Sequence, residues 1–415
     1  MGLKVLSSWP KNILPTARSS RLRNLKTMAD CRSFTSTRPQ PKQLSAPASY
    51  YRGGTSRAVI FQAKDIPENH DERRSMFLQI MGSPDPNGRQ LNGMGAGISS
   101  LSKICIISPS TNNETDVDYT FVGIGIEDEV VDLNGNCGNM SAAVGPFAFN
   151  NRLLGKRTYD EDGMAEVKIL NTNTNVIIKS TFPVADGEAV TAGDFTIDGV
   201  GGSGAQITLD FLRPGGSKTG KLLPSGNVTD TIDGIETSII DSANPCVFLT
   251  AEALGVSPTI LPNDFNKLTD KLARLENIRS QAAVMMGLCK SSSEVPRVIP
   301  KIAIVSPPVS QITLSGVENS PEELDLVVRF ISDAQPHRAI PLTGALCTAS
   351  AAKINGSIVE KSLRGNSVKE GMVTIGHSSG KIQVSATISS TGDVECATVF
   401  RTARRIMEGR VFWNA

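Results

Sequence analysis

Two segments of this chain, residues 140–150 and 345–354, have helical periodicity and consist largely of small side chains. Each follows a turn that contains glycine, at 134–139 (Asn-Gly-Asn-Cys-Gly-Asn) and 342–345 (Leu-Thr-Gly-Ala). A helix with so little polar surface is buried, and its thin side chains let neighbouring strands approach closely. The repetition predicts two equivalent halves, each a layer of strands wrapped around one central helix.

The body beyond residue 49 is dominated by short β-rich runs bounded by Gly, Asn, Asp and Pro. Several runs alternate polar and apolar residues at period two, which is typical of antiparallel strands with one buried face. Further helical periodicity is confined to 71–81, 264–288, 322–331 and 402–407. We therefore predict an α+β fold with extensive antiparallel sheet. The Gly-, Pro- and Ser-rich stretch 214–227 predicts a domain boundary.

The charge balance excludes some classes of function. The 415 residues include 42 Lys and Arg against 41 Asp and Glu, but residues 1–49 alone hold nine basic residues and one acid, Asp30. The body is therefore acidic, which argues against nucleic acid as a partner, because Lys and Arg carry that interaction. No apolar run approaches the roughly 20 residues of a membrane-spanning helix. An anion bound by this body needs local donors and helix dipoles.

The basic segment 1–49 is rich in Arg, Ser and Thr and lacks the apolar core of a secretory signal. This composition predicts a mitochondrial transit peptide, with a stretch at 31–36 that looks like a processing site. The alternative is a disordered basic tail on a cytoplasmic protein, with Met28 as a second start. The seven Cys form no C-x-x-C pair and the three His show no metal-binding spacing. We expect reduced thiols and no zinc site built from local motifs.

The turn at 134–139 is the most informative candidate site. Asn and Gly tolerate positive φ, and such a turn before a helix leaves backbone N–H groups available to an anion. Cys137 lies in this turn, where a thiol can serve as an acid, a base or a nucleophile. Thr343 and Gly344 offer similar amides before the second helix, and Cys347 lies just inside it. Taken alone, the residues are explained as well by plain helix caps and small buried thiols.

Three further segments contain residue patterns that are associated with catalysis or ligand binding. Lys103 precedes an apolar strand, and a lysine in a closed site can act as a general base, although a surface lysine is the simpler explanation. The loop 52–56 (Arg-Gly-Gly-Thr-Ser) could bind a carboxylate through its Arg and its backbone, or be an ordinary turn. Residues 199–204 satisfy G-x-G-x-x-G but precede a strand and not a helix, which argues against a dinucleotide site.

Together these segments resemble the PrpF family, the group of AcnD-accessory proteins and methylaconitate or methylitaconate isomerases with the diaminopimelate epimerase-like fold. The matching segments run in order along the whole body, at 52–56, 88–93, 99–103, 132–147, 215–227, 241–245, 343–347, 375–380 and 401–409. The resemblance implies two pseudo-symmetric domains, each a curved, mostly antiparallel sheet wrapped around a central helix. The domains would span 50–214 and 215–397, with 398–415 returning to the first.

The resemblance also implies an active site in the cleft between these domains. The reaction would be a cofactor-free, metal-free proton transfer that moves or isomerises a C=C bond in a small unsaturated di- or tricarboxylate. By motif, Lys103 and Cys137 are the catalytic residues. The substrate-binding residues would be Arg52, Gly53, Gly54, Thr55, Ser56, Asn136, Gly138, Asn139, Asn244, Thr343 and Gly344. No membrane or nucleic acid is implied, and a homodimer is compatible with the family.

Two other functions stay open. A racemase or epimerase with paired thiols would use Cys137 and Cys347, although Cys347 is predicted inside its helix and not in the turn. A non-catalytic accessory protein would bind a tricarboxylate or a dehydratase without turnover. Departures from the family pattern beside the expected pocket, at Ile98, Leu101 and Cys246, leave aconitate, 2-methylaconitate, methylitaconate and larger alkyl homologues as candidate substrates.

Overall fold

The computed structural model describes residues 42–155, 159, 161–332, 335–365 and 371–415. The predicted processing stretch at 31–36, and most of the predicted transit peptide, lie outside these residues. Residues 43–49, which the sequence analysis assigned to the basic tail, belong instead to strand β1 (Gln43–Gly53). They are strand because β1 pairs along its whole length with β21 (Ala403–Asn414), the last strand of the chain.

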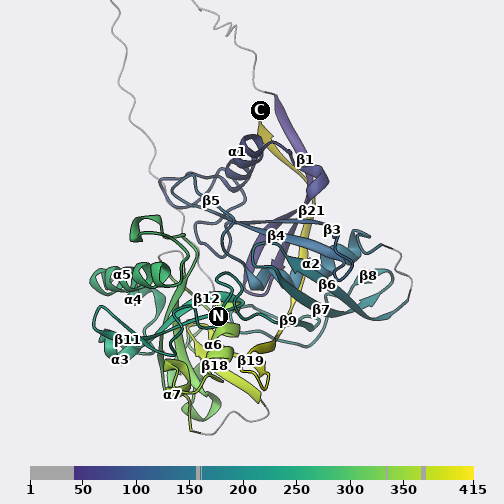
Figure 1. The fold of residues 1–415 in the computed structure, drawn as a ribbon. Helices are drawn as coiled ribbons and strands as arrows, with labels where there is room; N and C mark the ends of the chain where they lie inside the picture. Colours follow the sequence, from purple (N-terminus) through teal and green to yellow (C-terminus); the bar gives the residue numbers. More distant parts are fainter. Residues whose placement is uncertain (1–41, 156–158, 160, 333–334, 366–370) are drawn as a thin grey trace, which may run out of the picture. The chain divides into compact units, whose positions relative to one another are not determined.

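The first half of the body is a sheet with the strand order β21–β1–β2–β3–β4–β6–β7–β9 (Figure 1, purple to teal, with β21 in yellow). From β1 to β7 the neighbours are antiparallel, parallel, antiparallel, parallel and antiparallel. The strands are β2 (Ser56–Gln62), β3 (Lys103–Pro109), β4 (Val117–Ile124), β5 (Val131–Asp132), β6 (Gly163–Asn171), β7 (Val176–Ala185), β8 (Glu188–Ala189) and β9 (Ile207–Leu212).

The second half repeats this pattern in the order β11–β12–β13–β16–β18–β19. Its neighbours are again antiparallel, parallel, antiparallel, parallel and antiparallel, so β1 to β4 correspond to β11, β12, β13 and β16. The strands are β10 (Asp230–Ile232), β11 (Ile235–Ser242), β12 (Asn244–Thr250), β13 (Lys301–Ser306), β16 (Leu326–Ser332), β17 (Gln335–Pro336), β18 (Met372–His377), β19 (Gly380–Ile388) and β20 (Val394–Arg401).

Strand β20 joins the halves, because it pairs with β19 on one side and with β9 on the other. Four of the pairs among the described strands are parallel and the rest are antiparallel, which agrees with the predicted α+β fold. A small separate hairpin consists of β14 (Gln311–Ile312) and β15 (Glu318–Asn319). The chain passes from β9 to β10 through the turn-rich stretch 214–227, and the domain boundary there stays a prediction.

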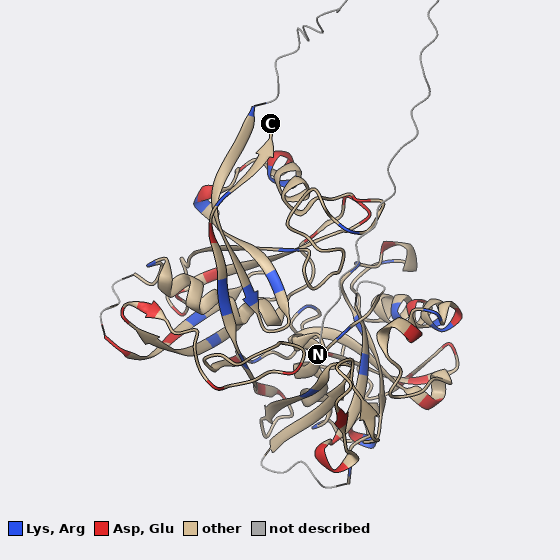
Figure 2. Cartoon of the chain, turned by 180° about the vertical axis from the view of Figure 1, so that it is seen from behind, with Lys and Arg blue, Asp and Glu red and all other residues tan. Residues whose placement is uncertain are grey.

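One helix lies inside each half. Helix α2 (Gly138–Asn150) packs against β1, β6 and β7, and helix α6 (Leu342–Ala351) packs against β11, β12 and β19. All residues of α6 and all but the last of α2 are buried, and neither helix contains a charged side chain (Figure 2). The small residues are needed: Gly145 lies against Ser180 and Phe182, and Gly344 lies against the ring of Phe330. This confirms the expectation that strands enclose both helices.

Two further helices cover the opposite faces of the sheet, each in the crossover between parallel strands. Helix α1 (His70–Met81) connects β2 to β3, and α5 (Thr269–Met285) connects β12 to β13. Helix α1 begins at Asn69, whose side chain accepts hydrogen bonds from two backbone amides, and ends at Gly82 with φ 78°. The shorter helices are α3 (Ala251–Leu254), α4 (Pro262–Phe265), α7 (Ile358–Lys361), η1 (Ala63–Asp65), η2 (Ser292–Glu294) and η3 (Pro321–Glu323). No described helix is long and apolar enough to span a membrane.

Two predicted helices are wrong. Most of 322–331 and 402–407 is strand, in β16 and β21 respectively. Strand β16 lies between β13 and β18, and β21 follows β1, so the hydrogen bonds of neighbouring strands outweigh a weak local helical period. The helix predicted at 345–354 begins earlier, at Leu342, which places Thr343 and Gly344 in its first turn and not in a preceding loop.

We predict that Gly145→Ala destabilises the protein by about 1–3 kcal/mol, because overpacking a filled core forces neighbours to move. A Cβ at this position would lie 2.7 Å from the Ser180 hydroxyl oxygen and 2.8 Å from the Phe182 ring. Urea unfolding measures the change. Gly409→Ala in β21 is the matched control, since its added Cβ would meet nothing within 4 Å. Equal stability of the two variants would contradict the close packing around α2.

Candidate active site

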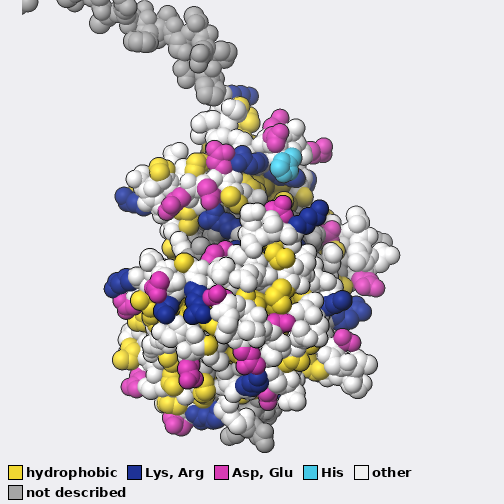
Figure 3. All heavy atoms as spheres, turned by 60° about the vertical axis from the view of Figure 1, so that its left-hand side comes forward, with side chains coloured by type: hydrophobic (Ala, Val, Ile, Leu, Met, Phe, Trp, Pro, Cys, Tyr) yellow, Lys and Arg dark blue, Asp and Glu magenta, His cyan; other side chains and the backbone are white. Residues whose placement is uncertain are grey.

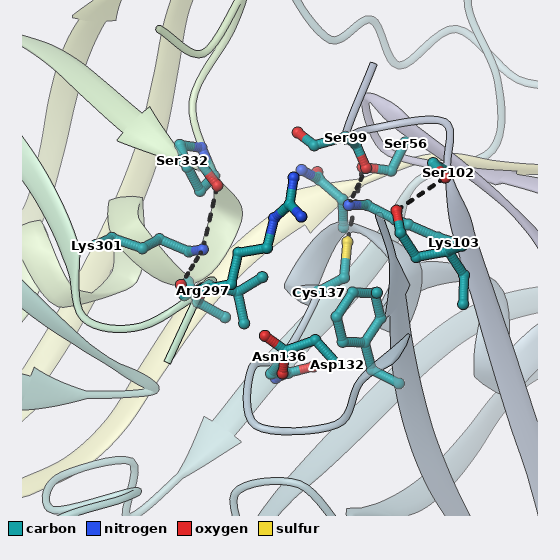
Figure 4. A pocket seen from close by; sticks show the side chains of 18 of the residues that line it. Ser56, Ser99, Ser102, Lys103, Asp132, Asn136, Cys137, Arg297, Lys301 and Ser332 are labelled. Carbon is teal, nitrogen blue, oxygen red and sulfur yellow. Dashed lines mark hydrogen bonds between the residues drawn. The ribbon is translucent and has the colours of Figure 1, made fainter. Parts of the chain in front are cut away.

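A cavity is lined by residues from both halves, at the ends of α2 and α6 (Figure 4). Its empty volume is about 670 Å³, part of which is open to solvent. The polar and ionisable residues of its lining include Ser56, Ser99, Ser102, Lys103, Asp132, Asn136, Cys137, Asn139, Arg297, Lys301, Ser332, His337 and Thr343.

The N-termini of the two central helices meet in this cavity. Cys137 is the N-cap residue of α2 and Pro341 that of α6, and neither helix has a side-chain cap. A Cβ on Gly138 would lie 2.6 Å from the Leu342 side chain and 3.0 Å from that of Thr343, so the two ends are in contact. The first amides of a helix have no intrahelical acceptor, and its N-terminus carries a partial positive charge. Two such ends in one cavity favour an anionic ligand.

Lys103 and Cys137 lie in the same cavity and point into it (Figure 4). Lys103 is the first residue of β3; its Nζ donates to the carbonyl oxygen of Ser99 at 2.5 Å and lies 5.3 Å from the centre of the Phe121 ring. The Cys137 thiol donates to the Ser56 hydroxyl at 3.6 Å. The structure therefore brings together an amine, a thiol and two helix N-termini.

Asn136 adds a hydrogen-bond donor to the cavity wall. Its Oδ1 accepts from the side chain of Asn171 at 3.0 Å, which fixes the orientation of the amide. Its Nδ2 is buried and has no partner among the described residues. A buried donor without an acceptor is costly, so this group is suited to an acceptor that a ligand brings.

Two cationic residues in the cavity were not found from the sequence. Lys301, the first residue of β13, is buried, and its Nζ donates to the carbonyl oxygen of Val298 at 3.3 Å and to the Ser332 hydroxyl at 3.4 Å. Arg297 lies nearby and pairs with Asp128. The signal that singled out Lys103, a lysine at the start of an apolar strand, is also present at Lys301. On the face shown in Figure 3, basic and acidic side chains are mixed.

His337 also lines the cavity and was missed, because one His without a metal-binding spacing gives no signal. Burial, together with the charges of Lys103 and Lys301, lowers its pKa to about 3. Its Nδ1 accepts from the backbone amide of Ala339 at 3.1 Å. The neutral ring therefore carries its proton on Nε2, which is a donor.

The chain matches the family model described as PrpF protein over residues 43–414. The chain belongs to the PrpF family. The 3-methylitaconate isomerase of Eubacterium barkeri is 40% identical over 378 residues, which cover 89% of this chain and 97% of that protein. The 2-methyl-aconitate isomerase of Shewanella oneidensis is 37% identical over 388 residues, covering 89% and 97%. This PrpF protein is an isomerase.

Solved structures agree with the fold. A methylitaconate-delta-isomerase superposes with a TM-score of 0.72 at 40% identity, over 89% of this chain and 96% of that one. A hydroxyproline epimerase from Agrobacterium vitis reaches a TM-score of 0.51 at 8% identity, over 89% and 93%, which concerns the fold alone. The epimerase-like fold predicted for this PrpF protein is therefore confirmed.

The cavity of the PrpF protein includes only part of the predicted binding set. Its lining contains Ser56, Asn136, Gly138, Asn139 and Thr343, while Thr55 borders an adjoining groove. The predicted residues outside the lining are Arg52, Gly53, Gly54, Asn244 and Gly344.

Several of these residues hold cavity-lining residues in place without lining the cavity themselves. Arg52 donates through Nη1 to the carbonyl oxygens of Gly54 and Thr402, so it holds the loop and does not reach the cavity. Gly53 and Gly54 let Asn139 pack closely, since a Cβ on either would lie within 2.5 Å of an Asn139 oxygen. Asn244 donates to the Thr343 hydroxyl at 3.2 Å and thereby positions the first turn of α6.

The second thiol considered for a racemase lies elsewhere. Cys347 is inside α6, outside the cavity lining, and its thiol donates to the carbonyl oxygen of Ile240 at 3.6 Å. Burial raises the pKa of this thiol well above its ordinary value. Cys347 therefore does not oppose Cys137 across the cavity. Within the described residues, no group of three or more His, Cys, Asp and Glu could hold a metal ion.

We predict that the protein loses stability as the pH falls from 6.5 to 5.5. Burial lowers the pKa values of His337 and His377 to about 3, so below pH 6.5 the unfolded chain takes up protons that the folded chain does not. Each His then contributes a loss of roughly 1 kcal/mol per pH unit. Urea unfolding at several pH values measures the slope. His377→Gln, away from the cavity, should have a shallower slope, and parallel curves for variant and wild type would contradict the assignment.

Proposed function

We propose that this PrpF protein isomerises a small unsaturated di- or tricarboxylate by moving an allylic proton. The supporting observation is that Lys103 and Cys137 share one cavity with the N-termini of α2 and α6. The named relatives are isomerases of methylitaconate and methylaconitate, which belong to this class of acids. Aconitate, 2-methylaconitate, methylitaconate and a larger alkyl homologue are the candidate substrates.

Carboxylates of the substrate would bind at the two helix N-termini. The first amides of each helix, which have no intrahelical acceptor, can donate to a carboxylate from two directions, and the aligned peptide dipoles favour its charge. Asn136 Nδ2 and His337 Nε2 add neutral donors, which can bind the anion without changing the charge of the site. The Ser56 hydroxyl, which lines the cavity, accepts from the Cys137 thiol.

The reaction proceeds through a delocalised anion. Lys103, in its neutral form, takes a proton from the carbon next to the C=C–COO⁻ system, and the electron pair of the broken C–H bond spreads into the carboxylate as a dienolate. Amide donors stabilise that charge as it develops. A proton is then added at the other allylic carbon, so that the double bond has moved and no oxidant is needed. Rotation about the bond that becomes single gives access to cis and trans products.

Two roles fit Cys137. It can deliver the second proton as an acid, or it can donate a hydrogen bond to the developing charge. The contact of its thiol with the Ser56 hydroxyl is compatible with either role, because the hydroxyl can accept from the thiol and pass a donor on to the substrate. A substitution that keeps a hydrogen-bond donor at position 137 but removes the acidic thiol distinguishes the two roles.

We predict that Lys103→Ala lowers kcat by at least about 10²-fold, the usual contribution of a positioned general base. The assay follows deuterium uptake by NMR in D₂O with trans-aconitate, 2-methylaconitate or an alkylitaconate. Cys137→Ala should also be slow. Cys137→Ser should be faster than Cys137→Ala only if Cys137 acts as a hydrogen-bond donor and not as an acid.

Cys289→Ala is the control for the loss of a thiol, because Cys289 lies outside the cavity lining. Isomerisation by Lys103→Ala at the wild-type rate would remove the lysine from the mechanism. Full activity of Cys137→Ala would limit that residue to binding. Tight binding of a tricarboxylate by the wild type, without turnover of any acid in the panel, would favour the accessory-protein function.

We predict that Asn136→Asp weakens binding of the carboxylate substrate by about 10- to 100-fold, since a donor becomes an anionic acceptor. The same change places a negative charge at the N-terminus of α2, which should leave stability unchanged or slightly raised. KM and thermal unfolding, measured on the same preparation, test both parts. A variant that loses stability without a rise in KM would show that Asn136 serves the fold and not the ligand.

A further inference from the structure

Arg401 is a buried cation that the mechanism above does not use. It is the last residue of β20, the strand that joins the two halves, and it is only 6% exposed. Its Nη1 donates to the carbonyl oxygen of Phe400 at 3.0 Å, whereas its Nε is sealed from solvent without an acceptor. Among the residues that the structure describes, no carboxylate pairs with its guanidinium. The burial of such a charge is costly, and nothing acidic in the described fold offsets it.

Another buried arginine shows how the fold accommodates a structural guanidinium. Arg329 in β16 is 4% exposed, and its three nitrogens all have acceptors. Nε donates to the carbonyl oxygen of Ile260 at 3.0 Å, Nη1 to that of Val328 at 3.0 Å, and Nη2 to the side chain of Gln311 at 2.9 Å. Buried polar groups are normally paired in this way. Hydrogen bonding to the described fold therefore does not explain why Arg401 is an arginine.

Arg401 lies directly behind a residue of the cavity wall. A Cβ on Gly54 would be 2.2 Å from Asn139 Oδ1 and 3.2 Å from Arg401 Cδ, so the two side chains flank the same point. Asn139 is the second residue of α2 and lines the cavity. Its Oδ1, on the side of Arg401, is buried without a donor. The positive end of this amide, Nδ2, is thus available to a ligand in the cavity.

We propose that Arg401 is a positioning residue for a substrate carboxylate at the N-terminus of α2, and that it acts through the Asn139 amide. This inference rests on the proposed function and adds a residue from outside the cavity lining. The guanidinium attracts the amide oxygen and so directs Nδ2 at the carboxylate. Its charge also adds to the helix dipole, because charges in a water-poor interior are weakly screened. The fold is less stable for holding this charge, and the anion binds more tightly.

The test measures ligand affinity and stability on the same variants. Propane-1,2,3-tricarboxylate, which has no double bond and cannot react, is titrated by calorimetry. We expect Arg401→Met to weaken its binding by at least about 10-fold, since a charge acting on the anion is lost. The unfolding temperature should stay the same or rise, because an apolar side chain replaces an unpaired buried charge. Arg401→Lys should bind more tightly than Arg401→Met, since it can carry the charge.

Kinetics separate a role in binding from a role in the chemical step. With an unsaturated tricarboxylate, Arg401→Met should raise KM by about 10-fold or more and lower kcat by less than about 3-fold. Asn139→Ala tests the route of the effect. If Arg401 acts through Asn139, the double variant binds propane-1,2,3-tricarboxylate no more weakly than Asn139→Ala alone.

Arg329→Met is the matched control, since Arg329 is also buried and lies outside the cavity lining. It should lower the unfolding temperature, because it leaves three buried acceptors without their donor, and leave the affinity of the folded protein unchanged. Its response is therefore the reverse of that expected for Arg401→Met.

Several results would overturn the inference. They are an Arg401→Met variant with wild-type affinity, a loss of stability or of folding in that variant, and an Arg401→Lys variant that binds no better than Arg401→Met. Full additivity of the Asn139 and Arg401 substitutions, wild-type affinity of Asn139→Ala, or a wild type that binds no tricarboxylate would also overturn it.

The failure of this inference can be told apart from failure of the proposed function. Lys103→Ala should lose turnover and still bind propane-1,2,3-tricarboxylate in a way that depends on Arg401. The same dependence in a wild type that turns over none of the acids would keep the inference and reject the isomerisation mechanism. Turnover with a KM that is independent of Arg401 would keep the mechanism and overturn the inference.

Discussion

The contact between the N-termini of two uncharged, buried helices is the constraint on which the rest of this structure depends. Helices α2 and α6 lie inside their strand layers, and their ends can come into contact because position 138 is glycine. Neither end has a side-chain cap. Because the first amides of a helix have no intrahelical acceptor and each N-terminus carries a partial positive charge, two such ends at one place favour an anionic ligand.

The two halves of the internal repeat contribute different side chains to the cavity. The first half contributes the amine of Lys103, the thiol of Cys137 and the unpaired amide donor of Asn136. The second half contributes the buried ammonium of Lys301 and the neutral ring of His337. A duplicated fold with a different chemistry on each side binds an unsymmetrical molecule in one orientation. Such orientation is what the proposed reaction at one allylic carbon demands.

Much of the fold could be predicted from the sequence, and the failures have one cause. The periodic strands and the small-residue helices carry local signals, whereas 402–407 is strand only because β1 lies beside it. In the site, Lys103 and Cys137 were predicted from the family resemblance, and both line the cavity. Arg52 was assigned to the ligand because a guanidinium suits a carboxylate, yet it bonds to the backbone of Gly54 and Thr402. No local pattern shows which partner a side chain meets.

The sequence by itself determined the α+β class, the two buried helices and the family, since these follow from periodicity, side-chain size and motifs in order along the chain. Mitochondrial import stays a prediction, because it depends on the basic segment 1–49. Only the tertiary structure decided that Lys301, Arg297 and His337 share a cavity with Lys103 and Cys137. They come from strands and loops more than 150 positions apart, and their proximity is fixed by the pairing of β20 with β9 and by the contact of α2 with α6.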